Sequence, residues 1–275
     1  MTTEVSAARV AAVQMTSTAS VAANLEAARE GLEQAAAAGA QVVVLPENFA
    51  FLGLRDADKL QVAESPGTGP IQDALARYAR ELGLWIVAGT LPLRVAAEAR
   101  VAAASLVFDA EGQIVARYDK IHLFDVDIPG KAEAYRESAN VRPGSDIVVV
   151  DTPCGRLGLS VCYDLRFAEL YRSMSAQGAE WFAVPAAFTV PTGEAHWEVL
   201  LRARAIENLA TVVAAGQVGI HDNGRATYGD SLIVNHWGVV QARRRQDPGV
   251  VVAEIDRQAQ REARATFPVL QHRKL

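Results

Sequence analysis

Short apolar segments alternate with helix-like segments along this chain, and this alternation constrains its fold more than any other feature. The first four segments read as strand, helix, strand and helix, at residues 9–15, 21–38, 42–45 and 71–82. The strand at 42–45 is apolar at every position, so it needs cover on both faces. This order predicts an α/β fold in which helices cover the sheets.

The middle of the chain also requires antiparallel pairs. Residues 109–112 carry a hairpin turn signal between the apolar runs 102–109 and 114–118. Further strands are expected at 84–91, 147–150, 157–161, 181–184, 211–215, 231–235, 239–242 and 250–255, and further helices at 167–177 and 194–209. No linker-like composition interrupts the chain, so we expect a single domain over 1–275, with a core at about 8–256 and a C-terminal tail at 257–275. The expected architecture is a layered α/β sandwich of mixed sheets.

The helix expected at 194–209 carries an apolar stripe. Its four members recur at helical spacing: Val199, Leu200, Ala203 and Ile206. We predict that this stripe faces the core and that Arg202 and Arg204 point elsewhere.

Charge and composition disfavour several classes of partner. Lys and Arg total 27 against 32 Asp and Glu, and they are scattered except at 243–245 and 273–274, which disfavours nucleic acid. No stretch approaches the roughly 18 apolar residues of a membrane span, and residues 1–12 lack the apolar centre of a secretion signal. The two cysteines, Cys154 and Cys162, exclude a disulfide framework. We therefore expect a cytoplasmic protein without membrane or nucleic-acid partners; the role of Cys154 is left open.

Three reactive side chains stand at the ends of apolar strands. Cys162 follows Gly158-Leu-Ser-Val and precedes a helix expected near residue 167, whose N–H groups and dipole would stabilise a thiolate. Glu47 follows the strand at 42–45, and Lys120 ends the strand from Ile114. Each alone could be ordinary: a buried small hydrophobe, a loop acid and a surface lysine. Together they supply a nucleophile, a base and an oxyanion donor for amide hydrolysis, although spacing alone does not bring them together.

The segments around these residues resemble the nitrilase, or carbon–nitrogen hydrolase, superfamily. The matching runs are Leu45-Pro-Glu47-Asn48, Tyr118-Asp-Lys120-Ile-His-Leu-Phe124 and Leu159-Ser-Val-Cys162-Tyr-Asp-Leu-Arg-Phe167. The resemblance extends over about residues 10–255 and implies an α-β-β-α sandwich, a homodimer and hydrolysis without metal or organic cofactor. It also implies a triad in which Glu47 is the general base, Lys120 stabilises the oxyanion and Cys162 is the nucleophile. A second site glutamate is implied after the lysine: Glu137 is preferred, with Glu133 as its competitor.

Further segments are similar to the branch of that superfamily that contains deaminated glutathione amidase and the ω-amidases. They are 122–130, 188–198 and 200–208. The resemblance implies a small-molecule amide substrate, a short 2-oxo acid with a distal amide; deaminated glutathione would give 2-oxoglutarate and cysteinylglycine. The implied substrate-binding residues are Tyr163, Arg166, Phe188, Thr189 and His196. Asp230 stands where the family usually has His, which leaves the contact of that loop with an anionic substrate open.

Other functions are compatible with parts of this pattern. The same triad would serve an aliphatic amidase, a nitrilase or an N-carbamoyl amine hydrolase. A non-catalytic dimeric scaffold of the same fold is a further alternative, although it would not need all three groups. His122, Asp125 and Asp127 match no metal-binding spacing, so no metal site is predicted.

Overall fold

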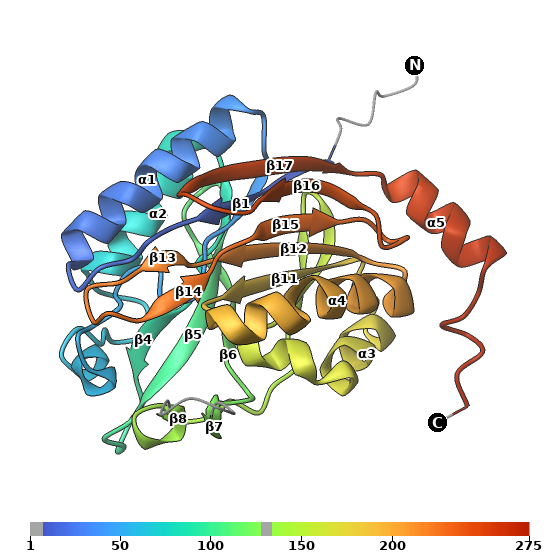
Figure 1. Cartoon of the computed structure of the whole chain (residues 1–275). Coiled ribbons are helices and arrows are strands. Elements are labelled where there is room, and N and C mark those ends of the chain that lie inside the picture. Colours follow the sequence, from blue (N-terminus) through green and yellow to red (C-terminus); the bar gives the residue numbers. More distant parts are fainter. Residues whose placement is uncertain (1–7, 128–133, 275) are drawn as a thin grey trace.

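Two β-sheets packed face to face form the centre of the molecule (Figure 1). The computed structural model describes residues 8–127 and 134–274. The strands of the first sheet are β1 (Ala8–Gln14), β2 (Val42–Val44), β3 (Trp85–Val87), β4 (Leu91–Arg94), β5 (Val101–Phe108), β6 (Ile114–Asp119) and β17 (Gly249–Ile255). Those of the second are β9 (Val149–Thr152), β10 (Gly155–Leu159), β11 (Trp181–Ala186), β12 (Thr211–Gly216), β15 (Ser231–Val234) and β16 (Val240–Arg244).

Each sheet combines a parallel centre with antiparallel edges. The first has the order β17-β1-β2-β3-β5-β4, with β6 also paired to β5, and β1, β2 and β3 are parallel. The second has the order β16-β15-β12-β11-β10-β9, with β10, β11 and β12 parallel. Two short antiparallel strand pairs, β7 (Asp125–Asp127) with β8 (Ala134–Arg136) and β13 (Val218–Ile220) with β14 (Ala226–Tyr228), lie outside these two sheets. The predicted mixed sheets are confirmed.

Helices cover the outer face of each sheet (Figure 1). They are α1 (Val21–Ala37) and α2 (Pro70–Leu82) on the first sheet, α3 (Ala168–Ala176) and α4 (Val190–Asn208) on the second, and α5 (Arg257–Thr266) near the C-terminus. Three short 3₁₀ turns complete the described elements: η1 (Asp56–Leu60), η2 (Glu137–Ala139) and η3 (Cys162–Arg166). The four-layer α-β-β-α sandwich is therefore as predicted. Within the described residues, no helix is both long and apolar enough to cross a bilayer.

The apolar strands are buried on both faces because alternate residues point into different layers. Ala12 and Val44 pack in one apolar cluster with the second sheet, whereas Ala11 and Val43 pack in another with α1 and α2. A backbone hydrogen bond of 2.8 Å from Val218 N to Met15 O also joins the end of β1 to the strand that follows β12. The two sheets thus share an apolar central layer.

Two differences from the sequence-based prediction change the account of the fold. The strand predicted at 84–91 is two strands, β3 and β4, separated by a turn that contains Gly89 with φ +40°. The segment predicted as a tail begins with α5, where Gln260 Nε2 donates to Glu180 O at 2.6 Å and to Leu209 O at 2.8 Å. Because these bonds tie α5 to the second half of the chain, it is an ordered part of the fold.

The prediction for the apolar stripe of α4 was wrong for Val199 and Ile206, whereas Leu200 is half-buried and packs against the core as predicted. Val199 and Ile206 are 68% and 50% exposed, and the buried face instead carries Trp197 and Leu201. Residues two positions apart on a helix point in directions that differ by about 200°. A stripe predicted two residues too late therefore faces the opposite side. Arg204, predicted to point away, is buried and donates two hydrogen bonds, of 3.0 and 2.8 Å, to the carbonyl of Leu165.

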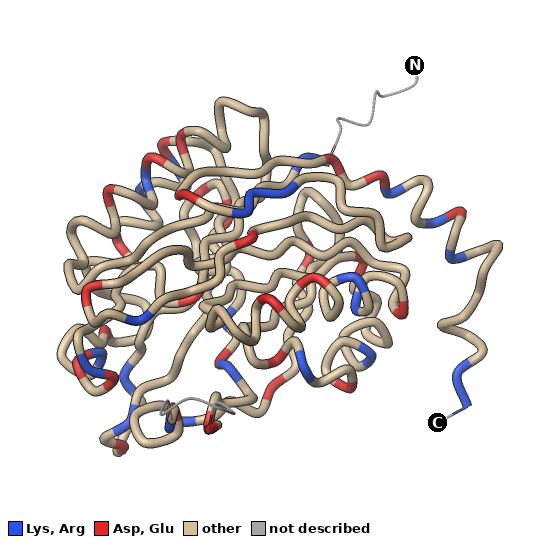
Figure 2. Tube along the Cα trace, in the orientation of Figure 1, with Lys and Arg blue, Asp and Glu red and all other residues tan. Residues whose placement is uncertain are grey.

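Charged side chains of both signs are interspersed over the described chain (Figure 2). The described basic residues 243–245 lie in and after β16, where Arg243 binds Asp230 and Glu198. The basic run that sequence inspection singled out is thus partly engaged in ion pairs with carboxylates.

The thiol of Cys154 is expected to make stability fall at alkaline pH. Cys154 is fully buried between β9 and β10, and burial raises its pKa to about 12. Above the ordinary thiol pKa of about 8.5, the unfolded chain loses this proton while the folded protein keeps it. The contribution of this buried thiol to the free energy of unfolding is therefore intact below about pH 8.5. It is lost, by about 1.4 kcal/mol per pH unit, as the pH rises toward 12.

This prediction can be measured by urea unfolding at pH values from about 8 to 11, comparing the wild type with Cys154→Ala. The variant should lose stability less steeply with rising pH. Parallel curves would show that Cys154 does not cause the alkaline loss.

Candidate active site

Glu47 is held rigidly just beyond the end of β2. Its side chain is 5% exposed, and its carbonyl oxygen accepts a 3.0 Å hydrogen bond from Gln217 Nε2. The next residue, Asn48, has φ +56° and donates its N–H to Thr90 Oγ1 at 2.9 Å. These contacts turn the chain sharply after the strand and place the carboxylate inside the molecule.

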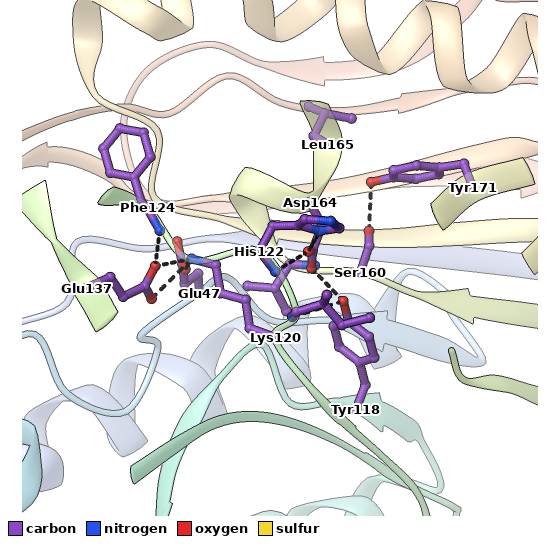
Figure 3. Close-up of polar contacts among 12 residues, drawn as sticks. Glu47, Tyr118, Lys120, His122, Phe124, Glu137, Ser160, Asp164, Leu165 and Tyr171 are labelled. Carbon is purple, nitrogen blue, oxygen red and sulfur yellow. Dashed lines mark hydrogen bonds and ion pairs between the residues drawn. The ribbon is translucent and has the colours of Figure 1, made fainter. Parts of the chain in front are cut away.

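Lys120 directly follows β6 and binds two carboxylates (Figure 3). Its Nζ lies 2.7 Å from Glu47 Oε1 and 2.9 Å from Glu137 Oε2. Glu137 Oε2 also accepts the N–H of Phe124 at 2.7 Å. The structure thus brings Glu137 to the lysine, whereas its competitor Glu133 lies outside the described residues.

The charges in this cluster support one another. Burial alone would lower the pKa of Lys120, but the carboxylates of Glu137 and Glu47 raise it well above its usual value. Burial alone would raise the pKa of Glu137, but the ammonium groups of Lys120 and Lys59 outweigh burial and lower it. Lys120 and Glu137 are therefore both ionised at neutral pH.

Cys162 lies at the first position of η3, just beyond β10, with φ +49°. Burial first, and then the carboxylate of Glu47, raise its pKa well above the usual value, against the opposing charge of Lys120 and the N–H of Ala187. Helix α3 begins at Ala168, close to the predicted residue 167, and the 3₁₀ turn η3 separates its N-terminus from the thiol. The thiol is therefore protonated at rest, contrary to the predicted stabilisation of a thiolate, and needs a base in order to attack.

Asp164 connects the segment of Lys120 to the segment of Cys162 (Figure 3). Its carboxylate, which is fully buried, accepts the hydroxyl of Tyr118 at 2.7 Å and the N–H of Val161 at 2.8 Å through Oδ2. Its Oδ1 accepts the N–H of His122 at 3.0 Å and lies 2.7 Å from His122 Nδ1. One side chain thus fixes residues on both sides of Lys120 and the residue before Cys162.

A pocket opens onto this cluster. Glu47, Lys120, Glu137 and Cys162 all line it, together with four of the five predicted substrate-binding residues: Tyr163, Arg166, Phe188 and Thr189. The fifth, His196, is exposed on α4 and does not line the pocket, although its Nδ1 lies 3.3 Å from Arg166 Nη1.

Sequence inspection missed further residues of the pocket wall. Lys59 lies in η1 and Arg225 follows the turn between β13 and β14, and both line the pocket. Neither follows an apolar strand or belongs to a recognisable motif. Only the folded arrangement of distant segments reveals them.

Asp230 has a structural role away from the pocket. It is buried, and its carboxylate binds Arg243 through two hydrogen bonds, of 2.6 and 2.7 Å. Its carbonyl oxygen accepts Trp197 Nε1 at 2.8 Å. It is not among the residues that line the pocket, so it does not oppose an anionic substrate there.

The side chains once considered as metal ligands have other partners. His122 binds Asp164, Asp125 accepts the N–H of Ser138 at 3.0 Å, and Asp127 pairs with Arg136 at 2.8 Å. Within 8–127 and 134–274, no group of three His, Cys, Asp or Glu side chains is arranged to hold a metal ion.

Gly89 allows the close approach that positions Glu47. A Cβ at this residue would collide with the carbonyl of Pro46, immediately before Glu47. We expect Gly89→Ala to lower the free energy of unfolding by about 3 kcal/mol, because it combines a positive φ with overpacking. Gly83→Ala is the matched control: φ is +65°, but no atom lies within 4 Å of the added Cβ, so a loss of about 1 kcal/mol is expected. Equal losses in urea unfolding would refute a role for the Pro46 contact.

The comparisons with known proteins agree with this fold. The family model for carbon–nitrogen hydrolases matches residues 9–265, and the chain belongs to this family. The sequence-based family prediction is therefore confirmed, and the chain is an enzyme that hydrolyses amide carbon–nitrogen bonds.

Individual relatives are similar over most of the chain. The deaminated glutathione amidase of Yersinia enterocolitica is 43% identical over 267 residues, which cover 96% of this chain and 92% of that protein. The deaminated glutathione amidase of Homo sapiens is 41% identical over 269 residues, with coverage of 96% and 82%. The crystal structure of the C. elegans NitFhit protein superposes with a TM-score of 0.90 at 39% identity. The superposition covers 97% of this chain and 65% of the chain in that crystal structure.

Proposed function

We propose that this hydrolase cleaves its substrate through a thioester on Cys162, and that deaminated glutathione is the substrate. The observation that carries the mechanism is the buried cluster in which Lys120 binds Glu47 and Glu137 beside the thiol of Cys162. The substrate is supported by the relatives that bear that name and by the basic wall of the pocket.

The first half of the reaction forms the acyl-enzyme. Glu47 accepts the proton of Cys162 as the sulfur attacks the amide carbon, because the resting thiol is protonated. The ammonium of Lys120 and the backbone N–H of Tyr163 hold the negative charge that develops on the carbonyl oxygen. Glu47 then gives the proton to the departing amine, the C–N bond breaks, and cysteinylglycine leaves.

The second half returns the enzyme to its starting state. Glu47 takes a proton from a water molecule, which attacks the thioester and releases 2-oxoglutarate. The proton then returns to the sulfur. Glu137 stays ionised and keeps the ammonium of Lys120 oriented throughout.

The experiment is to measure release of cysteinylglycine from deaminated glutathione by the wild type and by Cys162→Ala. The wild type should turn over and the variant should not, and mass spectrometry of the quenched wild type should find the 2-oxoglutaryl group on Cys162. Full activity of the variant would refute the mechanism. Preference for a nitrile, an N-carbamoyl amine or a simple aliphatic amide in a competitive panel would refute the substrate.

The homodimer and the cytoplasmic location remain predictions from the sequence. Light scattering of the purified chain would test the first. A single-chain mass in solution would contradict it.

A further inference from the structure

The wall of the pocket is basic although the chain carries a net charge of −5. Six basic side chains and three acidic ones line it: Arg55, Lys59, Lys120, Arg136, Arg166 and Arg225 against Glu47, Asp56 and Glu137. Such a wall favours an anionic ligand.

Half of these cations are already paired. Lys120 binds its two glutamates, Arg55 binds Asp58 at 2.8 Å and Arg136 binds Asp127 at 2.8 Å. For Lys59, Arg166 and Arg225, no carboxylate among the described residues lies within ion-pair distance. These three are the cations with charge left for a ligand.

Arg225 has an unused donor in addition to its charge. Its guanidinium carbon lies 4.7 Å from the ring centre of Tyr135, and its Nη2 donates to the carbonyl of Ala187 at 3.3 Å. Its Nε is buried and has no hydrogen-bond partner within the part of the chain that the structure describes. A buried donor without a partner is unfavourable, so a ligand oxygen at this position would be stabilising.

Arg166 and Arg225 stand at the two ends of a row of aromatic rings. Arg166 lies 5.7 Å from the ring centre of Tyr163, which lies 5.1 Å from that of Phe124. Phe124 in turn lies 5.1 Å from Tyr135, under Arg225. The two guanidinium groups thus stack on different rings of this row, Arg166 on Tyr163 and Arg225 on Tyr135, so each could bind a carboxylate of its own.

We propose that Arg225 binds the carboxylate of the leaving amine, while Arg166 binds the carboxylate of the acyl part. The substrate class is therefore an amide with a carboxylate on each side of the scissile bond. This assignment rests on the proposed function. Arg166 belongs to the same turn as Cys162, to which the acyl part stays attached, whereas Arg225 follows the exposed hairpin turn at Asn223, where the amine can depart.

The test measures kcat/KM for the wild type and Arg225→Met, each with two substrates that differ by one group. Deaminated glutathione is compared with the same compound carrying a carboxamide in place of its glycine carboxylate. We expect Arg225→Met to lower kcat/KM for deaminated glutathione about 30-fold, mainly through KM, as befits a lost charge-assisted hydrogen bond. For the carboxamide the variant should differ from the wild type by less than about twofold, because the partner of Arg225 is already absent.

Two further variants make the result specific. Arg166→Met should lower kcat/KM for both compounds, since both keep the acyl carboxylate. Arg77→Met is the matched control, because its guanidinium also stacks on a tyrosine ring, that of Tyr78 at 5.2 Å, but does not line the pocket, and it should leave both values nearly unchanged.

The outcomes separate the two proposals. Equal loss for both compounds in Arg225→Met, or no loss for either, would overturn the role of Arg225 while leaving the proposed function intact. Failure of the wild type to release cysteinylglycine would overturn the proposed function itself, and this assignment with it.

Discussion

Replacement of Lys120 by methionine is expected to lower kcat about a thousandfold and the free energy of unfolding by about 3 kcal/mol. The loss of activity follows from removal of the cation that would hold the oxyanion. The loss of stability follows because Glu47 and Glu137 would remain buried near each other with no positive charge between them. Steady-state kinetics and urea unfolding measure the two effects independently.

The double variant Lys120→Met with Glu137→Gln distinguishes these causes. Removing one buried carboxylate charge should restore much of the stability but none of the activity. Recovery of neither would show that the stability loss comes from packing of the lysine side chain. Recovery of activity would show that Lys120 does not stabilise the transition state.

Asp164→Asn is the second substitution with a large expected effect. Its carboxylate accepts a backbone N–H on each oxygen, so either orientation of the asparagine amide points an NH₂ group at a donor, the N–H of Val161 or that of His122. We expect a loss of about 2 kcal/mol in unfolding free energy. We also expect kcat to fall about a hundredfold, because Lys120 and Cys162 lose their common support.

Tyr118→Phe is the matched control, because it removes one of the same hydrogen bonds without inserting a donor. Its stability loss should be about 1 kcal/mol, and kcat should fall less than about threefold. The split between kcat and KM identifies positioning, since Asp164 does not line the pocket and KM should change little. A large KM effect with unchanged kcat would contradict this role.

The positions of Glu47, Lys120 and Cys162 could be predicted because each interrupts or ends an apolar strand. Side chains at strand ends can meet at one edge of a layered sandwich. The family resemblance implied that these three form one triad. Lys59 and Arg225 could not be found in this way, since each lies in a polar turn of ordinary composition. Their place in the pocket depends on contacts between segments that are distant in sequence.

Strand and helix types were predicted well where the pattern was unambiguous, as in the short, fully apolar run at 42–45 and the helical period at 71–82. Helix α4 failed because apolar residues occur on both of its sides, so periodicity could not tell Trp197 and Leu201 from Val199 and Ile206. The prediction of a stabilised thiolate at Cys162 failed for another reason. Burial and the neighbouring carboxylate of Glu47 set its pKa, and neither is visible in the segment that contains it.

The apolar layer between the sheets has a consequence for how activity is lost. Glu47 and Lys120 follow strands of the first sheet, whereas Cys162 follows a strand of the second. The distance between base and nucleophile is therefore set by the apolar side chains that separate the sheets. A compact state that keeps its secondary structure but loosens this layer would be inactive, and neither half of the chain alone would contain a complete set of reacting groups. Enzyme activity is thus a direct assay of tertiary packing.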